Sequence, residues 1–196
     1  MTKKEVIWRE ILHQAIENKK IEFTQKELAK KFGFSLSTVF NAIRIPRQSG
    51  AIKVTGKNFI IQDAEKFLYI WATQRNINKE IIYQTNVLAS SKKIEGMMPA
   101  NIVFACFSAY AHKYKSAPAE YDKVYVYAAQ EGAAEIQKRF PSAKGYTNLI
   151  VLKSDSWLKN FGGLITPDAQ TFVDLWNLHE WYAKDFLSAL KQKMFE

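Results

Sequence analysis

Residues that build covalent and metal-bound sites are scarce in this chain of 196 residues, which contains one cysteine and three histidines. A single cysteine, Cys106, excludes an internal disulfide and any zinc site built from several cysteines. Because Cys106 lies within the apolar run Ile102–Ala109, we expect a buried and unreactive thiol.

Long hydrophobic runs are also missing. No stretch approaches the roughly 20 apolar residues that a membrane-spanning helix requires. The opening residues, MTKKEVIWRE, contain acids too early for a secretory signal. We therefore expect a soluble, cytoplasmic protein.

The patterns that mark phosphate and metal chemistry are incomplete. Gly162-Gly163 lacks the Lys-Ser/Thr pair of a phosphate-binding loop and instead predicts a turn into a short strand ending at Thr166. Four acids are of the type that holds a divalent metal, but none stands in a recognisable metal-binding spacing: Asp155, Asp168, Asp174 and Glu180.

The histidines give no clearer sign of catalysis, because His112 and His179 have no serine or cysteine partner that the sequence can assign. We expect no catalytic residues, no metal and no cofactor. An enzyme that processes DNA remains an alternative, and a metal bound between Asp155 and Asp168 would favour it.

Negative charge is in short supply. The chain has 28 basic and 19 acidic residues, a net charge of +9 at pH 7. The excess is concentrated in residues 1–62, where twelve basic and five acidic residues leave a net charge of +7. This distribution favours a polyanionic partner for the front of the chain.

The stretch Thr24–Asp63 has the pattern of two short helices. Thr24 and Glu27 have the spacing of a capping box, in which the hydroxyl and the carboxylate satisfy free N–H groups at a helix start. Gly33 is suited to end that helix in a left-handed conformation, and Ser35 to cap the next.

In the second helix, four apolar residues follow the spacing of a buried stripe: Leu36, Val39, Phe40 and Ile43. The polar residues left on or beside the opposite face are Ser37, Thr38, Asn41 and Arg44. Pro46 disfavours helical geometry at Ile45, so we expect the helix to end near Arg44 or to kink.

Two apolar runs, Ala51–Thr55 and Asn58–Gln62, are separated by Gly56-Lys57 and predict a hairpin with a basic tip. With a preceding helix over Glu5–Lys19 and a β segment at Ile21–Phe23, the layout predicts a winged helix-turn-helix, whose second helix enters the DNA major groove.

The expected contacts divide into two groups. Ser37, Thr38, Asn41 and Arg44 would read base edges, and Lys26, Lys30, Ser35, Arg47, Lys53 and Lys57 would contact phosphates. Seven basic residues and one acid give residues 25–57 a net charge of +6, which favours DNA over the alternative, a protein-interaction module.

Beyond a polar linker at Gln74–Lys79, strand and helix patterns alternate. Strands are expected at Glu80–Val87, Val124–Tyr127 and Asn148–Leu152, and helices at Pro99–Lys113, Gly132–Phe140 and Asp168–Leu190, the last broken around Asn177. The predicted fold class is α+β, with a winged helix-turn-helix over residues 1–76 and a small mixed α/β domain over residues 80–196 for a partner, an effector or dimerisation.

The segment Thr171–Leu190 is rich in aromatic residues, which are Phe172, Trp176, Trp181, Tyr182 and Phe186. They either fill the core or form an exposed patch for a partner protein or a second subunit. The oligomeric state, monomer or homodimer, stays open.

The order of these parts resembles the AbiEi-type antitoxin regulators of type IV toxin–antitoxin systems. The resemblance rests on the winged helix, the strands at Val124–Tyr127 and Asn148–Leu152, and above all the segment Thr166–Leu175, TPDAQTFVDL. After Leu175 the chain departs from the family pattern, with Trp176–Tyr182 in place of small and charged residues.

The resemblance implies promoter binding through the winged helix and repression of an operon that also encodes a nucleotidyltransferase-like toxin. We therefore expect a sequence-specific regulator of transcription that binds double-stranded DNA, represses its own operon and is antitoxin-like. The alternative is a protein-interaction antitoxin that neutralises the toxin through the C-terminal domain.

Overall fold

The computed structural model describes residues 1–161 and 163–195, so Gly162, in the predicted turn, and Glu196 lie outside the described residues. It is an α+β fold with two separate sheets. The chain divides into two compact units, the first comprising Met1–Arg75 with the residues from Met194 on, and the second Asn76–Lys193. Within the described part of the chain, no helix combines the length and the apolar character needed to cross a membrane.

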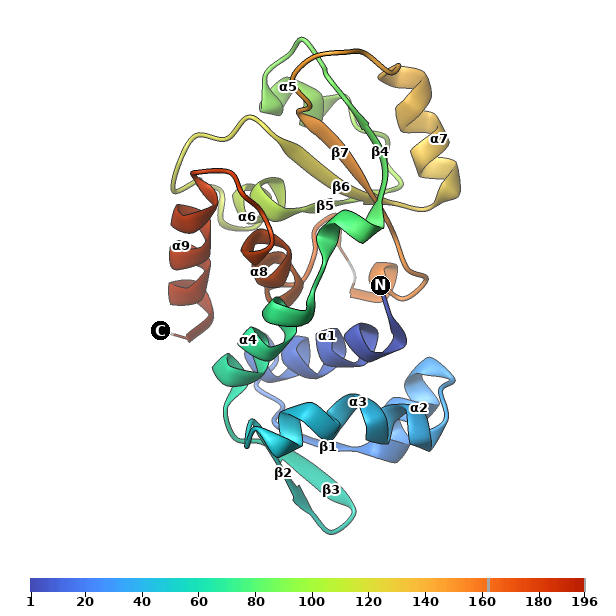
Figure 1. Ribbon diagram of the computed structural model, residues 1–196, viewed down its shortest axis with the longest axis vertical. Coiled ribbons are helices and arrows are strands. Elements are labelled where there is room, and N and C mark those ends of the chain that lie inside the picture. Colours follow the sequence, from blue (N-terminus) through green and yellow to red (C-terminus); the bar gives the residue numbers. More distant parts are fainter. Residues whose placement is uncertain (162, 196) are drawn as a thin grey trace. The chain divides into compact units, whose positions relative to one another are not determined.

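The first unit combines helices with a small antiparallel sheet in the order β1-β3-β2 (Figure 1). Its elements over residues 1–75 are α1 (Lys3–Ile16), β1 (Glu22–Thr24), α2 (Gln25–Phe32), α3 (Leu36–Gln48), β2 (Ile52–Thr55), β3 (Asn58–Ile61) and α4 (Ala64–Gln74). The predicted hairpin is confirmed as β2 and β3, with Val54 opposite Phe59. The predicted β segment before α2 pairs with β3, one residue further along than expected.

The helix caps are confirmed in part. The Thr24 hydroxyl accepts the N–H of Glu27 at 3.0 Å, Gly33 ends α2 at φ +66°, and the Ser35 hydroxyl accepts the N–H of Thr38. The prediction of the second capping-box bond, from the Thr24 N–H to the Glu27 carboxylate, is wrong. That carboxylate instead accepts from the Thr24 hydroxyl and from Lys20 at 2.7 Å. A complete capping box is found instead at the start of α1, between Thr2 and Glu5.

The buried face of α3 differs from the prediction. Val39 and Ile43 are buried as expected, but Leu36 and Phe40 are 56% and 49% exposed. The buried stripe is Val39, Ala42, Ile43 and Pro46, which has the same spacing shifted by three residues. Both stripes contain Val39 and Ile43, and the sequence alone favoured the one with the larger apolar side chains.

Pro46 does not end α3, which continues to Gln48. Proline has no N–H, so the carbonyl of Ala42, four residues earlier, loses its partner within the helix. The indole N–H of Trp8 donates to that carbonyl at 2.8 Å. A buried side chain of α1 therefore satisfies the acceptor that the proline leaves open.

Because the Trp8 indole replaces the N–H that Pro46 lacks, we expect energetic coupling between Trp8 and Pro46. Trp8→Phe should destabilise the protein, partly by leaving a buried carbonyl unsatisfied, an effect of about 1–3 kcal/mol. In a Pro46→Ala background the helix supplies the missing N–H, so Trp8→Phe should cost less, by about 1 kcal/mol or more. Urea unfolding of the four proteins measures the coupling.

Trp71→Phe is the matched control, because Trp71 is an equally buried tryptophan of the same unit that donates to Glu5 instead. Trp71→Phe should lower the free energy of unfolding by the same amount whether residue 46 is proline or alanine. Equal costs for Trp8→Phe in the two backgrounds would contradict the role given to the indole.

A buried ion pair joins the two ends of the first unit. The Arg75 guanidinium lies 3.2 Å from Oε1 of Glu5, with the two side chains 1% and 9% exposed. Trp71 donates to the same oxygen at 3.5 Å, and the N–H and hydroxyl of Thr2 donate to Oε2. The carboxylate of α1 is thereby fixed against the end of α4.

The second unit is built on a four-stranded sheet in the order β4-β7-β6-β5. Its elements are a 3₁₀ turn η1 (Ile77–Glu80), β4 (Ile81–Thr85), α5 (Ser91–Gly96), β5 (Ile102–Ala105), α6 (Cys106–Tyr114), β6 (Val124–Ala128), α7 (Gln130–Arg139), β7 (Leu149–Lys153), a 3₁₀ turn η2 (Leu158–Phe161), α8 (Asp168–Trp176) and α9 (Ala183–Phe195). β6 and β7 are parallel and are connected by α7, whereas the outer pairs are antiparallel.

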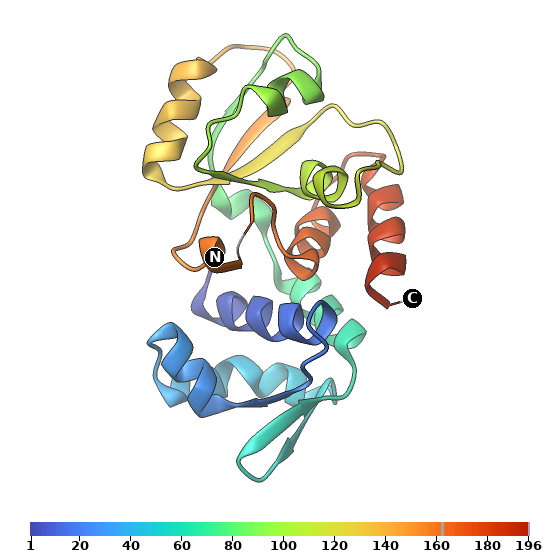
Figure 2. The same cartoon turned by 180° about the vertical axis from the view of Figure 1, so that it is seen from behind.

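Helices lie against both faces of this sheet. On one face lie the helices α5 and α7 (Figure 2). There Ile94 of α5 and Ile136 of α7 pack with Val126 of β6 and Val151 of β7. On the other face, Tyr125 contacts Phe107 of α6, and the Tyr127 hydroxyl donates to Asp174 of α8 at 2.7 Å. Both faces are covered, so β6 is buried along its whole length.

The prediction of one helix over Pro99–Lys113 is wrong. The chain forms β5 first and enters α6 only at Cys106, which has a positive φ of 53° and is fully buried. Periodicity could not separate the two states, because a short continuous apolar run fits a buried strand and a buried helix equally well.

The C-terminal helix is broken at Asn177, as predicted. Its aromatic residues are divided between the core and the surface. Phe172, Tyr182 and Phe186 are buried, whereas Trp176 and Trp181 are 44% and 78% exposed. Phe186 lies edge-on to Phe107 of α6, with 5.0 Å between the ring centroids.

Candidate nucleic-acid interface

α2 and α3 form a packed helix pair whose outer surfaces remain open. α2 buries Leu28, Ala29 and Phe32, and leaves Lys26 and Lys30 exposed. The left-handed conformation of Gly33 lets the chain turn within three residues into α3, where Ser35 forms the N-cap. Local sequence therefore fixes the start and the direction of α3.

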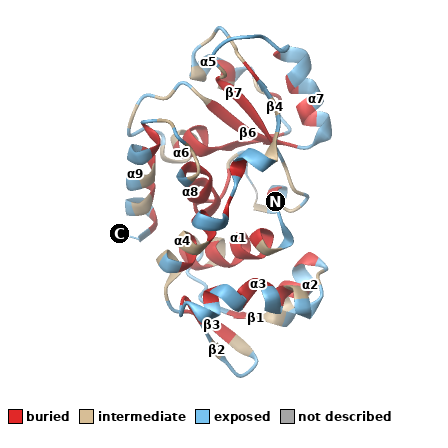
Figure 3. Ribbon diagram, viewed as in Figure 1, coloured by how far each residue is buried: buried red, intermediate tan, exposed pale blue. Residues whose placement is uncertain are grey.

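Buried and exposed residues alternate along α3 (Figure 3). By rotation along the helix, its polar face lies opposite its buried stripe. Residues rotate by about 100° per position, which places Ser37, Asn41 and Arg44 in one row away from the core. All three are exposed. Gln48 continues the row one turn beyond Arg44, and the sequence analysis missed it because the helix was expected to end before Pro46.

Thr38 and Ser35 have a structural role at the start of α3. The Ser35 hydroxyl accepts the N–H of Thr38 at 3.1 Å, and the two hydroxyls lie 2.9 Å apart. By rotation along the helix, Thr38 falls at the margin of the polar face and is only partly exposed. Ser35 is exposed and can still donate a hydrogen bond outward.

The hairpin adds two lysines. Lys53 projects from β2 and is exposed, and Lys57 lies in the two-residue turn between β2 and β3. Gly56 precedes it at φ +61°, a conformation that glycine adopts without steric cost. The predicted basic tip is therefore exposed on a tight turn.

The basic residues of residues 25–57 fall into two classes. Lys31 is neutralised by the buried Glu10, with 2.5 Å between nitrogen and oxygen. The other six are exposed and make no ion pair with any residue that the structure describes. These six are Lys26, Lys30, Arg44, Arg47, Lys53 and Lys57.

In the second unit, the acids considered as metal ligands each have separate partners. Asp155 accepts the N–H of Trp157, and Asp174 accepts the hydroxyl of Tyr127. Asp168 lies 2.7 Å from the Lys113 ammonium, and Glu180 lies 2.6 Å from the Lys123 ammonium. Among residues 1–161 and 163–195 there is no group of three or more histidine, cysteine, aspartate or glutamate side chains that could hold a metal ion.

A polar cluster around Glu95 escaped the sequence analysis. Oε1 of Glu95 accepts hydrogen bonds from Ser108 at 2.6 Å and from Tyr121 at 2.8 Å. His112 stacks on Phe104, and its Nε2 lies 3.3 Å from Oε2 of Glu95, a distance that suits an ion pair although the geometry is not that of a hydrogen bond. Burial and the adjacent Glu95 carboxylate raise the pKa of Tyr121.

That cluster orients an imidazole but does not supply a nucleophile. Ser108 is fully buried and directs its proton to Glu95 rather than to His112. Local patterns could not reveal the contact, because Glu95 lies on α5 and His112 on α6, with β5 between them. The arrangement joins α5 to α6.

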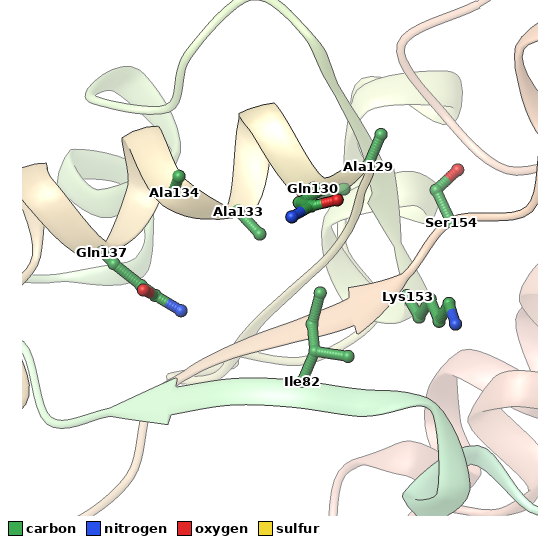
Figure 4. A pocket seen from close by; sticks show the side chains of 9 residues that line it. Ile82, Ala129, Gln130, Ala133, Ala134, Gln137, Lys153 and Ser154 are labelled. Atoms are coloured by element: carbon green, nitrogen blue, oxygen red, sulfur yellow. The ribbon is translucent and has the colours of Figure 1, made fainter.

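A cavity of about 570 Å³ lies where the parallel strands β6 and β7 end, beside α7 (Figure 4). Small side chains, including Ala129 and Ala133, leave this space open. Gln130, Gln137 and Lys153 supply its longer polar side chains. Its described lining therefore offers hydrogen bonds and one positive charge, without an acid–base pair.

Comparison with known proteins gives no match, whether with protein-family models, with curated proteins or with solved structures.

Proposed function

We propose that the first unit is a winged helix-turn-helix that binds double-stranded DNA with α3 in the major groove and the β2–β3 hairpin as the wing. Support comes from the polar row Ser37, Asn41, Arg44 and Gln48, which is turned away from the core. A helix that presents short polar and fork-shaped side chains outward is suited to base edges.

The observation that carries this proposal is the set of six exposed cations on α2, α3 and the hairpin that pair with no acid in the described part of the chain. Two other lysines of this unit, Lys20 and Lys31, pair with Glu27 and Glu10. These acids therefore do not neutralise any of the six exposed cations. Exposed positive charge without internal partners is what neutralises phosphates.

The side chains divide by chemistry. Asn41 suits the bidentate hydrogen bonds of adenine, and Arg44 those of guanine, with Ser37 and Thr38 as shorter contacts. Phosphate contacts would come from Lys26, Lys30, Ser35, Arg47, Lys53 and Lys57, which position the protein without specifying sequence. Arg44 thus contributes to both the charge and the reading of bases.

At the level of biology, we propose a sequence-specific regulator that represses its own operon and is antitoxin-like, as its resemblance to AbiEi-type regulators implies. The test is binding to the duplex upstream of its own reading frame, against a scrambled duplex of equal length and composition. Equal affinity for the two duplexes would contradict the proposal that the protein represses its own operon.

Ionic strength gives a quantitative prediction. If the five cations assigned to phosphates make those contacts, the logarithm of the binding constant should fall with the logarithm of salt concentration with a slope of about −4.5. Lys53→Ala/Lys57→Ala should reduce the magnitude of that slope by about 2 and weaken binding to all duplexes alike. Fluorescence anisotropy at several salt concentrations measures both effects.

A matched control is Lys138→Ala/Lys144→Ala, which removes the same charge from exposed lysines of the second unit. This variant should retain the slope of the unmodified protein. A salt dependence that the hairpin variant leaves unchanged would show that the hairpin is not part of the interface.

A second candidate function, toxin neutralisation through the second unit, is favoured by the exposed indoles of Trp176 and Trp181. Large exposed aromatic side chains are enriched at protein–protein interfaces. Co-expression with the neighbouring gene tests it: a stable complex favours this role, whereas recovery of the chain alone counts against it.

A further inference from the structure

α3 exposes two large apolar side chains beside its polar row. Leu36 is 56% exposed and Phe40 is 49% exposed, although both fit a buried stripe by sequence spacing. They lie four residues apart and therefore stack on one side of the helix. The core of the unit is complete without them, since Val39, Ala42, Ile43 and Pro46 fill the buried side of α3.

The position of Phe40 within α3 ties it to the polar row. Ser37 is three residues before Phe40 and Arg44 four residues after it, so both are its neighbours on the helix surface. By the same rotation, Arg47 falls on the side of Phe40 that faces away from the row. Phe40 thus lies between the polar row and Arg47, whereas Leu36 lies closer to the buried stripe.

The cations next to Phe40 favour a polyanion over an apolar protein surface as the partner that binds here. Arg44 and Arg47 carry charge that no described residue neutralises, and the adjoining α2 adds Lys26 and Lys30. An apolar partner would have to bury these cations unpaired, which is costly. Duplex DNA supplies phosphates for the cations.

In the major groove, the base edges present one apolar group, the C5-methyl of thymine. A phenyl ring beside residues that hydrogen-bond to bases is suited to cover that methyl group. We propose that Phe40, with Leu36 next to it, is a specificity-determining residue that recognises thymine methyl groups in the bound site. The inference rests on the proposed function of this unit as a reader of duplex DNA.

The experiment begins with the full chain and a pool of randomised duplexes, from which the bound sequences are selected. Each thymine of the selected site is then replaced by deoxyuridine, which removes the methyl group and leaves the hydrogen-bonding edge unchanged. At one or more positions, the unmodified protein should bind about three- to fivefold more weakly, the factor expected for burial of one methyl group. Phe40→Ala should bind the thymine and uracil duplexes equally at those positions.

Ile45→Ala is the matched control. Ile45 is also a partly exposed apolar residue of α3, at 37%, but it is about 140° around the helix from Phe40. This variant should keep the full sensitivity to deoxyuridine. Circular dichroism checks that both variants are folded, which their exposed positions favour.

The outcomes separate the two levels of inference. If no sequence is enriched from the pool, the proposed function as a sequence-specific reader fails. If a site is enriched but binding ignores the thymine methyl groups, or Phe40→Ala remains as sensitive as the unmodified protein, the assignment of Phe40 is overturned while the DNA-binding proposal stands. Loss of sensitivity in Phe40→Ala alone supports it.

Discussion

Replacing Asn41 and Arg44 together with alanine is expected to remove most of the preference for a selected duplex, with a smaller loss of affinity for unrelated duplex because one positive charge is removed. Each bidentate contact to a base discriminates by about 1–3 kcal/mol, so the loss of two should reduce the specific preference at least tenfold. Both side chains lie in the outward row of α3, away from the core, so the fold should be retained.

A companion variant separates base reading from charge. Asn41→Ala/Arg44→Lys keeps the positive charge but removes the planar fork that matches guanine. It should lose the preference as fully as the alanine pair, while its salt dependence stays that of the unmodified protein. A double alanine variant that still prefers the selected duplex would contradict the assignment of α3 as the recognition helix.

The largest effect on stability is expected from Glu5→Gln. The Arg75 guanidinium is 1% exposed and would lose the charge of Glu5, a change that costs about 3–5 kcal/mol in buried pairs. Urea unfolding of the full chain should show this loss, and hydrogen exchange should assign it to residues 1–75.

The exposed pair in the same unit provides the control. Lys66 lies 3.7 Å from Asp63, and the two side chains are 50% and 42% exposed. Lys66→Ala should change stability by less than about 1 kcal/mol, since solvent screens such pairs. If Glu5→Gln and Lys66→Ala lower the free energy of unfolding by similar amounts, the buried Glu5–Arg75 pair contributes no more to stability than an exposed pair.

The same carboxylate gives the unit a dependence on pH. Burial acts to raise the pKa of Glu5, but the Thr2 N–H, the Arg75 charge and the hydroxyl of Thr2 outweigh it and lower the pKa below its ordinary value of 4.5. A lowered pKa means that the stabilisation is complete above 4.5 and is lost as pH falls through the folded-state value. Glu5→Gln should lack this part of the acid transition.

What could be predicted from sequence was mostly local. The glycine at Gly33, the cap at Ser35 and the turn at Gly56 each depend on a few adjacent residues, and the structure has all three. The hairpin followed from two short apolar runs at a fixed separation. Such signals act within one or two turns of chain, so one sequence suffices to read them.

The errors arose where distant residues decide the outcome. Whether α3 continues past Pro46 depends on an indole from α1, 34 residues from the carbonyl it satisfies. Whether Leu36 and Phe40 are covered depends on which side of α3 meets α1, and periodicity allowed two answers. The run at Ile102 became a strand because β6 pairs with it along its length.

The candidate interface divides in the same way. The type of side chain at Asn41, Arg44 and Lys57 was visible in the sequence, and so was the local charge. Which cations are already paired was not visible, because Lys31 meets Glu10 only in the folded chain. The exposure of Phe40 was likewise hidden until the packing of α3 was known.

The interactions of the Glu5 carboxylate with Thr2 and Arg75 limit how this polypeptide can be shortened or tagged. A fragment that stops at Gln74 would keep every helix and strand of residues 1–75 but would lack the guanidinium that neutralises the buried Glu5 carboxylate. A tag fused directly before Met1 would crowd the Thr2 amide that donates to the same group. Fragments should therefore extend beyond Arg75, and affinity tags belong at the far terminus.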